Sequence, residues 1–228
     1  AEVEQVIEDF LSAIRRAIQA GFDGVELHGA NTYLIQQFVS PHSNVRQDKW
    51  GGSLNNRLRF PKTLLKRAKQ LVKEEADRPF LIGYRFSPEE IEEPGIQLYD
   101  TLKLLEQLIY HQVDYLHIST SDVWRSSIRD SQDLEPVIQK IIKKINGRVP
   151  LIGVGQIKTK QDAQRVLDAG IPLFALGKAL LLDPDWAEKV VSGREEEVIR
   201  AYRDELQADL ALPTAFVEDA RSYLEGKD

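Results

Sequence analysis

The stretch GFDGVELHGANTYLIQQFVSPHSN, Gly21–Asn44, decides how the chain is interpreted, because it joins a strand pattern to a polar loop. Its segment Asp23–Leu27 predicts a buried strand of a parallel sheet. Three residues with polar side chains follow within six positions: His28, Asn31 and Tyr33. In an α/β barrel the reacting groups lie on the loops that follow the strands, so this cluster is a candidate site. The same residue types also suit a strand end, a turn and a core, and their spacing alone leaves both interpretations open.

The rest of the chain alternates predicted helices and strands. Apolar residues keep one face of a helix between Val3 and Ile18, and Gly21 ends that helix. Five strands are predicted, at Asp23–His28, Phe80–Phe86, Val113–Ile118, Val149–Val154 and Leu173–Leu176. Helices are predicted at Asn55–Val72, Gln97–His111, Leu134–Ile145 and Gln161–Ala169, and the tail from Pro184 is expected to be helical. Pro61, near the start of the first of these, is either tolerated there or marks a restart of the helix.

Five strands separated by helices imply a parallel sheet with right-handed crossovers. A complete (β/α)₈ barrel needs three more strands. The pattern alone therefore leaves two folds open, an open five-stranded sheet and five-eighths of a barrel.

Composition narrows the class of protein. The chain has 228 residues, 42% hydrophobic and 29% charged, with a net charge of −6, which is typical of a globular protein. Its basic residues are mixed with acidic ones, so we expect no nucleic-acid partner and no anionic membrane surface. No stretch has the length of a bilayer-spanning helix, and no signal peptide is evident. We therefore expect a cytoplasmic protein.

Two residue types are absent from the chain. The lack of cysteine excludes disulfides, thiolate nucleophiles and cysteine-bound metal or iron–sulfur sites. The four histidines lie far apart, so we expect no catalytic metal. Methionine is also absent, and the chain starts inside a helical pattern. We therefore expect either residues ahead of Ala1 or methionines missing from the sequence.

A second informative stretch follows at Ser40–Pro61 and reads SPHSNVRQDKWGGSLNNRLRFP. Together the two stretches resemble the old yellow enzyme family of FMN-dependent NAD(P)H oxidoreductases. The shared elements are H-x-x-[HN]-x-Y and S-P-x-x-N-x-R-x-D-x-[YW]-G-G-S-x-x-N-R-x-R-F. The resemblance covers nearly the whole chain and implies a TIM-barrel type of α/β fold. Five of its eight units would be present, without the first three strands, as a single domain over residues 1–228 with a helical C-terminal tail.

The resemblance implies an ene-reductase, which reduces alkenes conjugated to a carbonyl group. NADH or NADPH would reduce FMN, and the flavin would pass hydride to the β-carbon of the alkene. His28 and Asn31 would donate hydrogen bonds to the carbonyl oxygen, as in an oxyanion hole. Tyr33 would protonate the α-carbon as general acid.

The resemblance also implies the residues that hold FMN. Arg85, in the sequence RFSP, would lie against the flavin ring, although an ion pair with Glu89 or Glu90 is the ordinary alternative. Four residues after the last two strands would bind the phosphate: Gly155, Gln156, Gly177 and Lys178. The family usually has arginine where this chain has lysine, which keeps the charge but loses the bidentate geometry.

The remaining signature residues are interpreted as scaffold rather than chemistry: Asp48, Trp50, Gly51, Gly52, Asn56, Arg57 and Arg59. His117 is expected in the core or supporting the site, Ser119 and Thr120 are unassigned, and His42 and His111 are expected to be structural or exposed.

Two other functions remain open. Without its first strands a barrel has open sheet edges, so the chain would be a truncated, non-catalytic fragment that associates with copies of itself. A different phosphate-binding barrel, such as an isomerase or synthase, is the other alternative. The expected partners are a small-molecule substrate and, through those open edges, a homo-oligomer.

Overall fold

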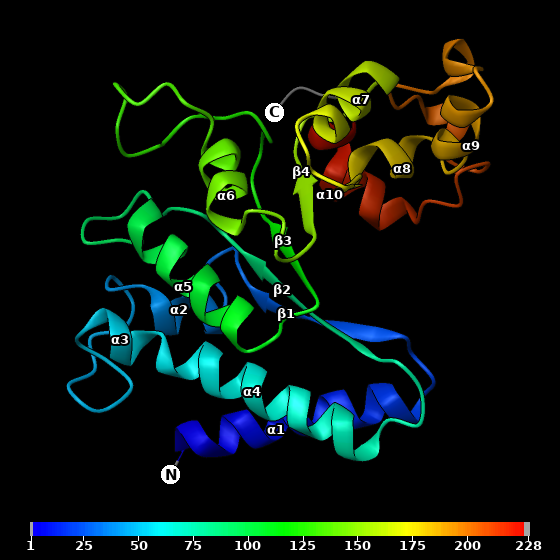
Figure 1. Ribbon diagram of the computed structural model, residues 1–228. Coiled ribbons are helices and arrows are strands. Elements are labelled where there is room, and N and C mark those ends of the chain that lie inside the picture. The colour runs from blue at the N-terminus through cyan, green and yellow to red at the C-terminus, as the bar shows by residue number, and fades with distance from the viewer. Residues whose placement is uncertain (1, 226–228) are drawn as a thin grey trace.

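The computed structural model describes residues 2–225, and its centre is one parallel sheet (Figure 1). Its strands lie in sequence order and are β1 (Gly24–Gly29), β2 (Leu81–Phe86), β3 (Tyr115–Ile118), β4 (Leu151–Val154) and β5 (Leu173–Ala175). All four neighbouring pairs are parallel, with helices in every connection. The five predicted strands and their parallel pairing are confirmed.

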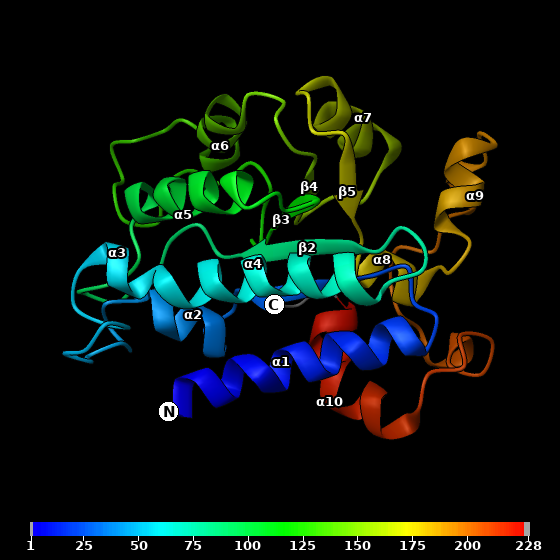
Figure 2. The same ribbon diagram turned by 60° about the horizontal axis from the view of Figure 1, so that its bottom comes forward.

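Helices follow one another around one face of this sheet, which we call the outer face (Figures 1 and 2). They are α1 (Glu2–Gln19), α4 (Arg59–Glu75), α5 (Leu98–Tyr110), α6 (Val137–Ile145) and α7 (Lys160–Asp168). Two short helices, α2 (Leu34–Val39) and α3 (Leu54–Arg57), lie between β1 and α4. The chain continues after β5 with α8 (Lys178–Leu182), α9 (Trp186–Val191) and α10 (Thr214–Glu225).

The outer face forms the hydrophobic core. Side chains alternate along a strand, so every second residue of β2 faces the helices. Ile82, Tyr84 and Phe86 do so, and each is at most 1% exposed. The helices supply matching apolar faces, and α4 for example buries Leu64 and Leu65 completely.

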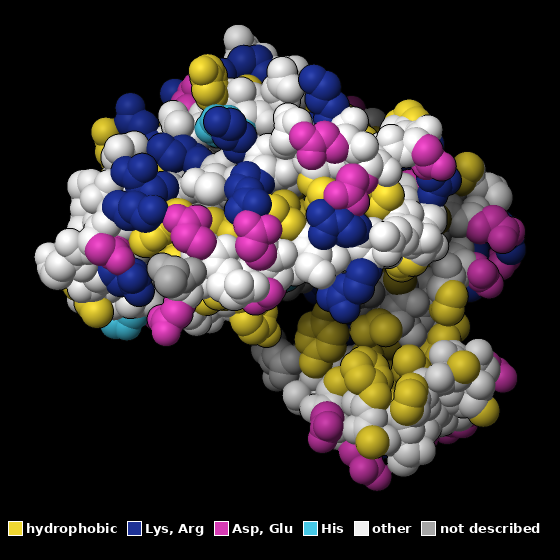
Figure 3. Space-filling model, turned by 90° about the horizontal axis from the view of Figure 1, so that it is seen from below, with side chains coloured by type: hydrophobic (Ala, Val, Ile, Leu, Met, Phe, Trp, Pro, Cys, Tyr) yellow, Lys and Arg dark blue, Asp and Glu magenta, His cyan; other side chains and the backbone are white. Residues whose placement is uncertain are grey.

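The opposite, inner face of the sheet carries polar side chains. Along β1 the alternation puts Glu26 and His28 on this face, in register with Gly83 and Arg85 of β2. Leu81 precedes them on the same face and is 49% exposed, so this side is only partly covered. Figure 3 shows a hollow beside the C-terminal helices, with apolar side chains on its wall.

Several predicted helix boundaries are wrong, and prolines explain two of them. The predicted helix Asn55–Val72 is two helices, α3 and α4, which meet at Leu58, so a restart just ahead of Pro61 is the alternative that the structure supports. Pro61 lies in the first turn of α4, where its missing N–H breaks no helical bond. The predicted helix Leu134–Ile145 starts only at Val137, because Pro136 caps it in an extended conformation with ψ 131°.

The tail is less helical than predicted. Two 3₁₀ turns, Glu195–Glu197 and Asp204–Leu206, separate α9 from α10. The tail has a small apolar cluster of its own, formed by Leu182, Tyr202, Val217 and Leu224. Among residues 2–225, no helix combines the length and the apolar composition needed to cross a bilayer.

Candidate functional site

The first site residue, His28, lies at the carboxyl end of β1 with its proton position fixed. Its Nδ1 accepts a hydrogen bond from the backbone N–H of Ala30, at 3.3 Å. A neutral imidazole whose Nδ1 accepts carries its proton on Nε2, so His28 presents an Nε2–H donor. The ring of Tyr33 meets the His28 ring edge to face, with 5.2 Å between centroids. The structure therefore brings these two predicted residues together.

Asn31 links the ends of three strands. Its backbone is left-handed, with φ 56°, a conformation that asparagine tolerates better than most residues. The Asn31 N–H donates to Ser87 Oγ after β2 at 3.0 Å, and Ser119 Oγ after β3 donates to Asn31 Oδ1 at 2.7 Å. Because Oδ1 is occupied, the Nδ2 group remains as the donor. Sequence reasoning left Ser119 unassigned and missed Ser87.

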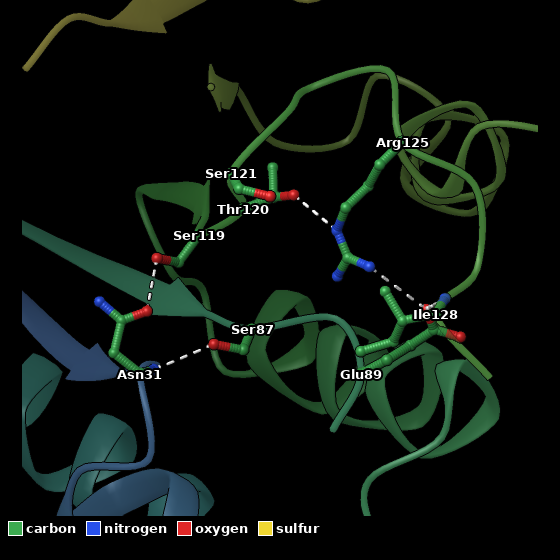
Figure 4. A pocket seen from close by; sticks show the side chains of 8 residues that line it. All are labelled: Asn31, Ser87, Glu89, Ser119, Thr120, Ser121, Arg125 and Ile128. Carbon is green, nitrogen blue, oxygen red and sulfur yellow. Dashed lines mark hydrogen bonds and ion pairs between the residues drawn. The ribbon is translucent and has the colours of Figure 1, made fainter. Parts of the chain in front are cut away.

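A cavity of about 480 Å³ opens beside Asn31 at the ends of β1, β2 and β3 (Figure 4). Its lining is Asn31, Ser87, Glu89, Ser119, Thr120, Ser121, Arg125 and Ile128. The volume is in the range of small-ligand sites. Hydroxyl groups dominate the wall, so the cavity offers both hydrogen-bond donors and acceptors to a small polar group.

Arg125 is the cation of this cavity and was not predicted. Its Nε donates to Thr120 Oγ1 at 2.6 Å, and its Nη1 lies 3.8 Å from Glu89 Oε2. Glu89 also accepts from Ser127 Oγ and from the Ile128 N–H, so it is held in place. Figure 4 shows the third guanidinium nitrogen pointing into the cavity.

Arg85 lies on the inner face and forms no ion pair with any residue that the structure describes. It is in register with His28 on one side and His117 on the other. Its buried Nε has no hydrogen-bond partner among the described residues. The alternative partners are engaged elsewhere, Glu89 with Arg125 and Glu90 with Gln36 and Ser40. A buried polar atom of this kind fits a site where a ligand completes the bonding.

A carboxylate–histidine pair lies beside Arg85. His117 Nδ1 is 3.0 Å from Glu26 Oε2, and His117 is 9% exposed. Tyr115 also approaches Glu26, and burial, followed by this carboxylate, raises the pKa of Tyr115 to about 12. Sequence reasoning missed Glu26. The available signal was its spacing of two from His28, which places both side chains on one face of a strand.

The four predicted phosphate residues lie after β4 and β5. Gly155 has φ 109°, and a Cβ there would come within 2.7 Å of the Asp122 backbone, so packing alone requires this glycine. Gln156 follows it, exposed and with φ 54°. At Gly177 a Cβ would meet Tyr223 Oη at 3.8 Å and, apart from its chain neighbours, no other atom of residues 2–225 within 4 Å, which leaves room for a ligand. The Lys178 ammonium lies 5.1 Å from the centroid of the Tyr223 ring.

The signature stretch Ser40–Pro61 bonds to itself and to the end of α2, as expected of a scaffold. Asn44 donates to the carbonyls of Phe38 and Trp50, and Arg57 donates to those of Val39 and Gly52. Among the other predicted scaffold residues, Asp48 pairs with Arg46, which together with the Trp50 N–H lowers the pKa of Asp48 to about 2. His42 is exposed and His111 caps α5, as expected.

Comparison with known proteins assigns the family. Residues 1–197 match the model of the NADH:flavin oxidoreductase / NADH oxidase family, and the chain belongs to that family. It is 50% identical over 200 residues to an NADH:fumarate oxidoreductase of Klebsiella pneumoniae, covering 86% of this chain and 22% of the relative. It is 46% identical to the probable NADH-dependent flavin oxidoreductase YqiG of Bacillus subtilis, covering 86% of this chain and 53% of that protein.

A solved structure gives the same fold. The old yellow enzyme homologue of Zymomonas mobilis superposes with a TM-score of 0.68 at 25% identity, over 84% of this chain and 52% of that one. The predicted TIM-barrel type and old yellow enzyme relationship are therefore confirmed. The family is one of NADH:flavin oxidoreductases, so its cofactors are a flavin with NADH or NADPH. This chain spans from about a fifth to about half of the length of these relatives. The family excludes the alternative of an isomerase or synthase barrel.

Proposed function

We propose that this chain carries the FMN and substrate site of an NAD(P)H-dependent oxidoreductase that reduces alkenes conjugated to a carbonyl or carboxyl group. The observation that carries the proposal is the pair of donors at the end of β1. His28 Nδ1 and Asn31 Oδ1 both accept intramolecular hydrogen bonds, which leaves His28 Nε2–H and Asn31 Nδ2–H to donate. The relative named for fumarate supports this substrate class, because fumarate is an alkene conjugated to carboxyl groups.

The inner face supplies residues that fit FMN. Arg85 places a fixed positive charge there, and its buried Nε has no partner within residues 2–225, which suits the electron-rich edge of a flavin ring. Gly177 and Lys178, with Gly155 and Gln156 on the neighbouring loop, would hold the phosphate. When bound, FMN would accept hydride from NADH or NADPH and return it to the substrate.

The loop after β1 would bind and protonate the substrate. His28 and Asn31 donate to the carbonyl oxygen and stabilise the negative charge that develops there. Tyr33 holds its phenolic proton for the α-carbon. The edge-to-face contact with His28 orients the Tyr33 ring, while Ser119 holds the Asn31 amide. The proposed roles of His28, Asn31 and Tyr33 therefore use side chains that these contacts already orient.

The test separates the two halves of the reaction in the purified flavin-loaded protein. Tyr33→Phe keeps the ring contact with His28 and removes the proton, so alkene reduction should fall by a factor of about 10²–10⁴. Asn31→Ala should lower it by about 10²–10³. Reduction of the flavin by NADH or NADPH should keep its rate in the Tyr33 variant. Tyr99→Phe, at an exposed tyrosine, is the matched control.

Two results would contradict the proposal. One is a protein that binds no FMN. The other is a Tyr33→Phe variant that reduces a conjugated enone or enoate as fast as the unmodified protein.

A further inference from the structure

The contact between Glu26 and His117 leaves one polar atom without a partner. Both Glu26 oxygens lie near His117 Nδ1, at 3.0 and 3.2 Å. A carboxylate beside Nδ1 holds the proton there, so Nε2 of the neutral ring is a hydrogen-bond acceptor. Nε2 is buried, and among the described residues nothing bonds to it. A buried acceptor without a partner is costly, which points to a ligand.

The surroundings of His117 are built to hold it in this position. Gly83 lies between Glu26 and Tyr115 in the register, and a Cβ there would come within 2.0 Å of the Tyr115 ring. The glycine therefore lets Tyr115 cross β2 and approach Glu26, whose carboxylate then has two neighbours from β3. A fixed carboxylate fixes the imidazole in turn, as in other carboxylate–histidine pairs.

The position of His117 in the sheet identifies the part of the ligand that it faces. In the proposed function Arg85 on β2 lies at the flavin ring, and the loops after β4 and β5 hold the phosphate. His117 is on β3, between them, in register with Arg85. The part of FMN that joins ring to phosphate is the ribityl chain, which carries hydroxyl groups. Hydroxyl groups are the donors that an Nε2 acceptor needs.

We propose that His117 binds FMN by accepting a hydrogen bond from a ribityl hydroxyl at Nε2, and that Glu26 is the positioning residue that orients its ring. This inference rests on the proposed function, because it requires FMN on the inner face. The proposal adds a contact between the protein and the middle of the cofactor. The residue that makes this contact, His117, was expected from the sequence in the core or in a supporting role.

The test compares two ligands in one protein. Dissociation constants are measured by flavin fluorescence for FMN and for an analogue in which an unsubstituted pentyl phosphate replaces the ribityl phosphate. His117→Phe should weaken FMN binding about tenfold and leave the analogue within about twofold, since one hydrogen bond is lost only where the hydroxyls exist. His117→Gln, which keeps an acceptor near Nε2, should recover most of the loss. Glu26→Gln should weaken FMN binding about threefold.

His111→Phe, at a histidine that caps α5 away from the inner face, is the matched control and should change neither constant. A misfolded variant would lose both ligands equally, so it cannot imitate the expected pattern. Equal losses for the two ligands in a variant that unfolds at the same urea concentration as the unmodified protein, or no loss for FMN, would overturn the role of His117. Failure of the unmodified protein to bind FMN would instead overturn the proposed function.

Discussion

The two faces of the sheet use the same strands for opposite purposes. On the outer face of β2, Tyr84 and Phe86 are fully covered by helices, and on β3 Leu116 is too. Arg85 lies between Tyr84 and Phe86 in the sequence but on the inner face, and its buried Nε has no hydrogen-bond partner in the part of the chain that the structure describes. The same holds for Nε2 of His117, directly after Leu116. Core positions and polar positions therefore alternate residue by residue along each strand. On the outer face, Tyr84 Oη is the buried polar atom without a partner among the described residues.

This difference follows from what covers each face. Burial of apolar area stabilises the outer face, at about 25 cal/mol per Å² removed from water. The inner face gives up part of that contribution, since it carries polar side chains, and among the described residues Arg85 Nε and His117 Nε2 are buried there without a hydrogen-bond partner. We therefore expect outer-face substitutions to change the free energy of unfolding and inner-face substitutions to change flavin affinity.

The largest effect is expected on the outer face. Leu116→Ala removes a side chain that is 0% exposed, and should lower the free energy of unfolding by about 2–5 kcal/mol. Leu81→Ala, at an inner-face leucine that is 49% exposed, is the matched control and should cost less than about 1 kcal/mol. Urea denaturation of both variants measures the two values. Equal losses would mean that the two faces are not different.

Gly83 tests whether the inner face is also packed. A Cβ at this position overlaps the Tyr115 ring, so Gly83→Ala should destabilise the protein by about 1–3 kcal/mol. Adding Tyr115→Ala removes the overlapping ring. In a double-mutant cycle, the cost of Gly83→Ala should then shrink. An undiminished cost would place the strain elsewhere in β2.

Arg85 tests whether the inner face serves a ligand. Arg85→Gln should weaken FMN binding by about ten- to a hundredfold, because a charged hydrogen-bond donor is lost. Without flavin, the free energy of unfolding should stay within about 0.5 kcal/mol, since no ion pair is broken. Fluorescence titration and denaturation measure the two quantities. Arg15→Gln, at an exposed arginine that pairs with Glu75, is the control for charge alone.

The smallest effect is a pH dependence at Tyr115. Its pKa in the folded protein is about 12, above the ordinary value of 10.0. Folding therefore favours the protonated phenol, and this contribution is complete below pH 10 and declines as the pH rises toward 12. Tyr115→Phe should flatten that part of the curve of unfolding free energy against pH. If Tyr115→Phe leaves the curve of unfolding free energy against pH unchanged, other groups cause the decline above pH 10.

Local patterns in the sequence were sufficient to predict the strands and the loop that carries the candidate site. The pattern of apolar residues predicted the five strands. The helices predicted between them implied that the strands are parallel. His28, Asn31 and Tyr33 share one loop because they share one short stretch of chain, so their proximity needed no tertiary information. Helix ends were less accurate, because the competition between Pro136 and a helical pattern at Leu134 is decided by backbone geometry.

The contacts that define the site were outside the reach of local patterns. Ser119 and Asn31 are 88 positions apart, and His117 and Glu26 are 91 apart. The register between strands decides which of these residues meet, and it is a property of the whole sheet. Sequence reasoning placed Arg85 at the flavin ring and left an ion pair with Glu89 or Glu90 open as the alternative, whereas in the folded chain both carboxylates bond to other groups.

The sequence by itself determined the strands, the parallel α/β class and the loop that carries the donors, because hydrophobic period and residue type act over a few positions. Only the tertiary structure decided which polar atoms of Asn31, Arg85 and His117 have hydrogen-bond partners among the described residues and which do not. That outcome depends on distances between strands far apart in the chain, and these distances exist only once the helices have buried the outer face.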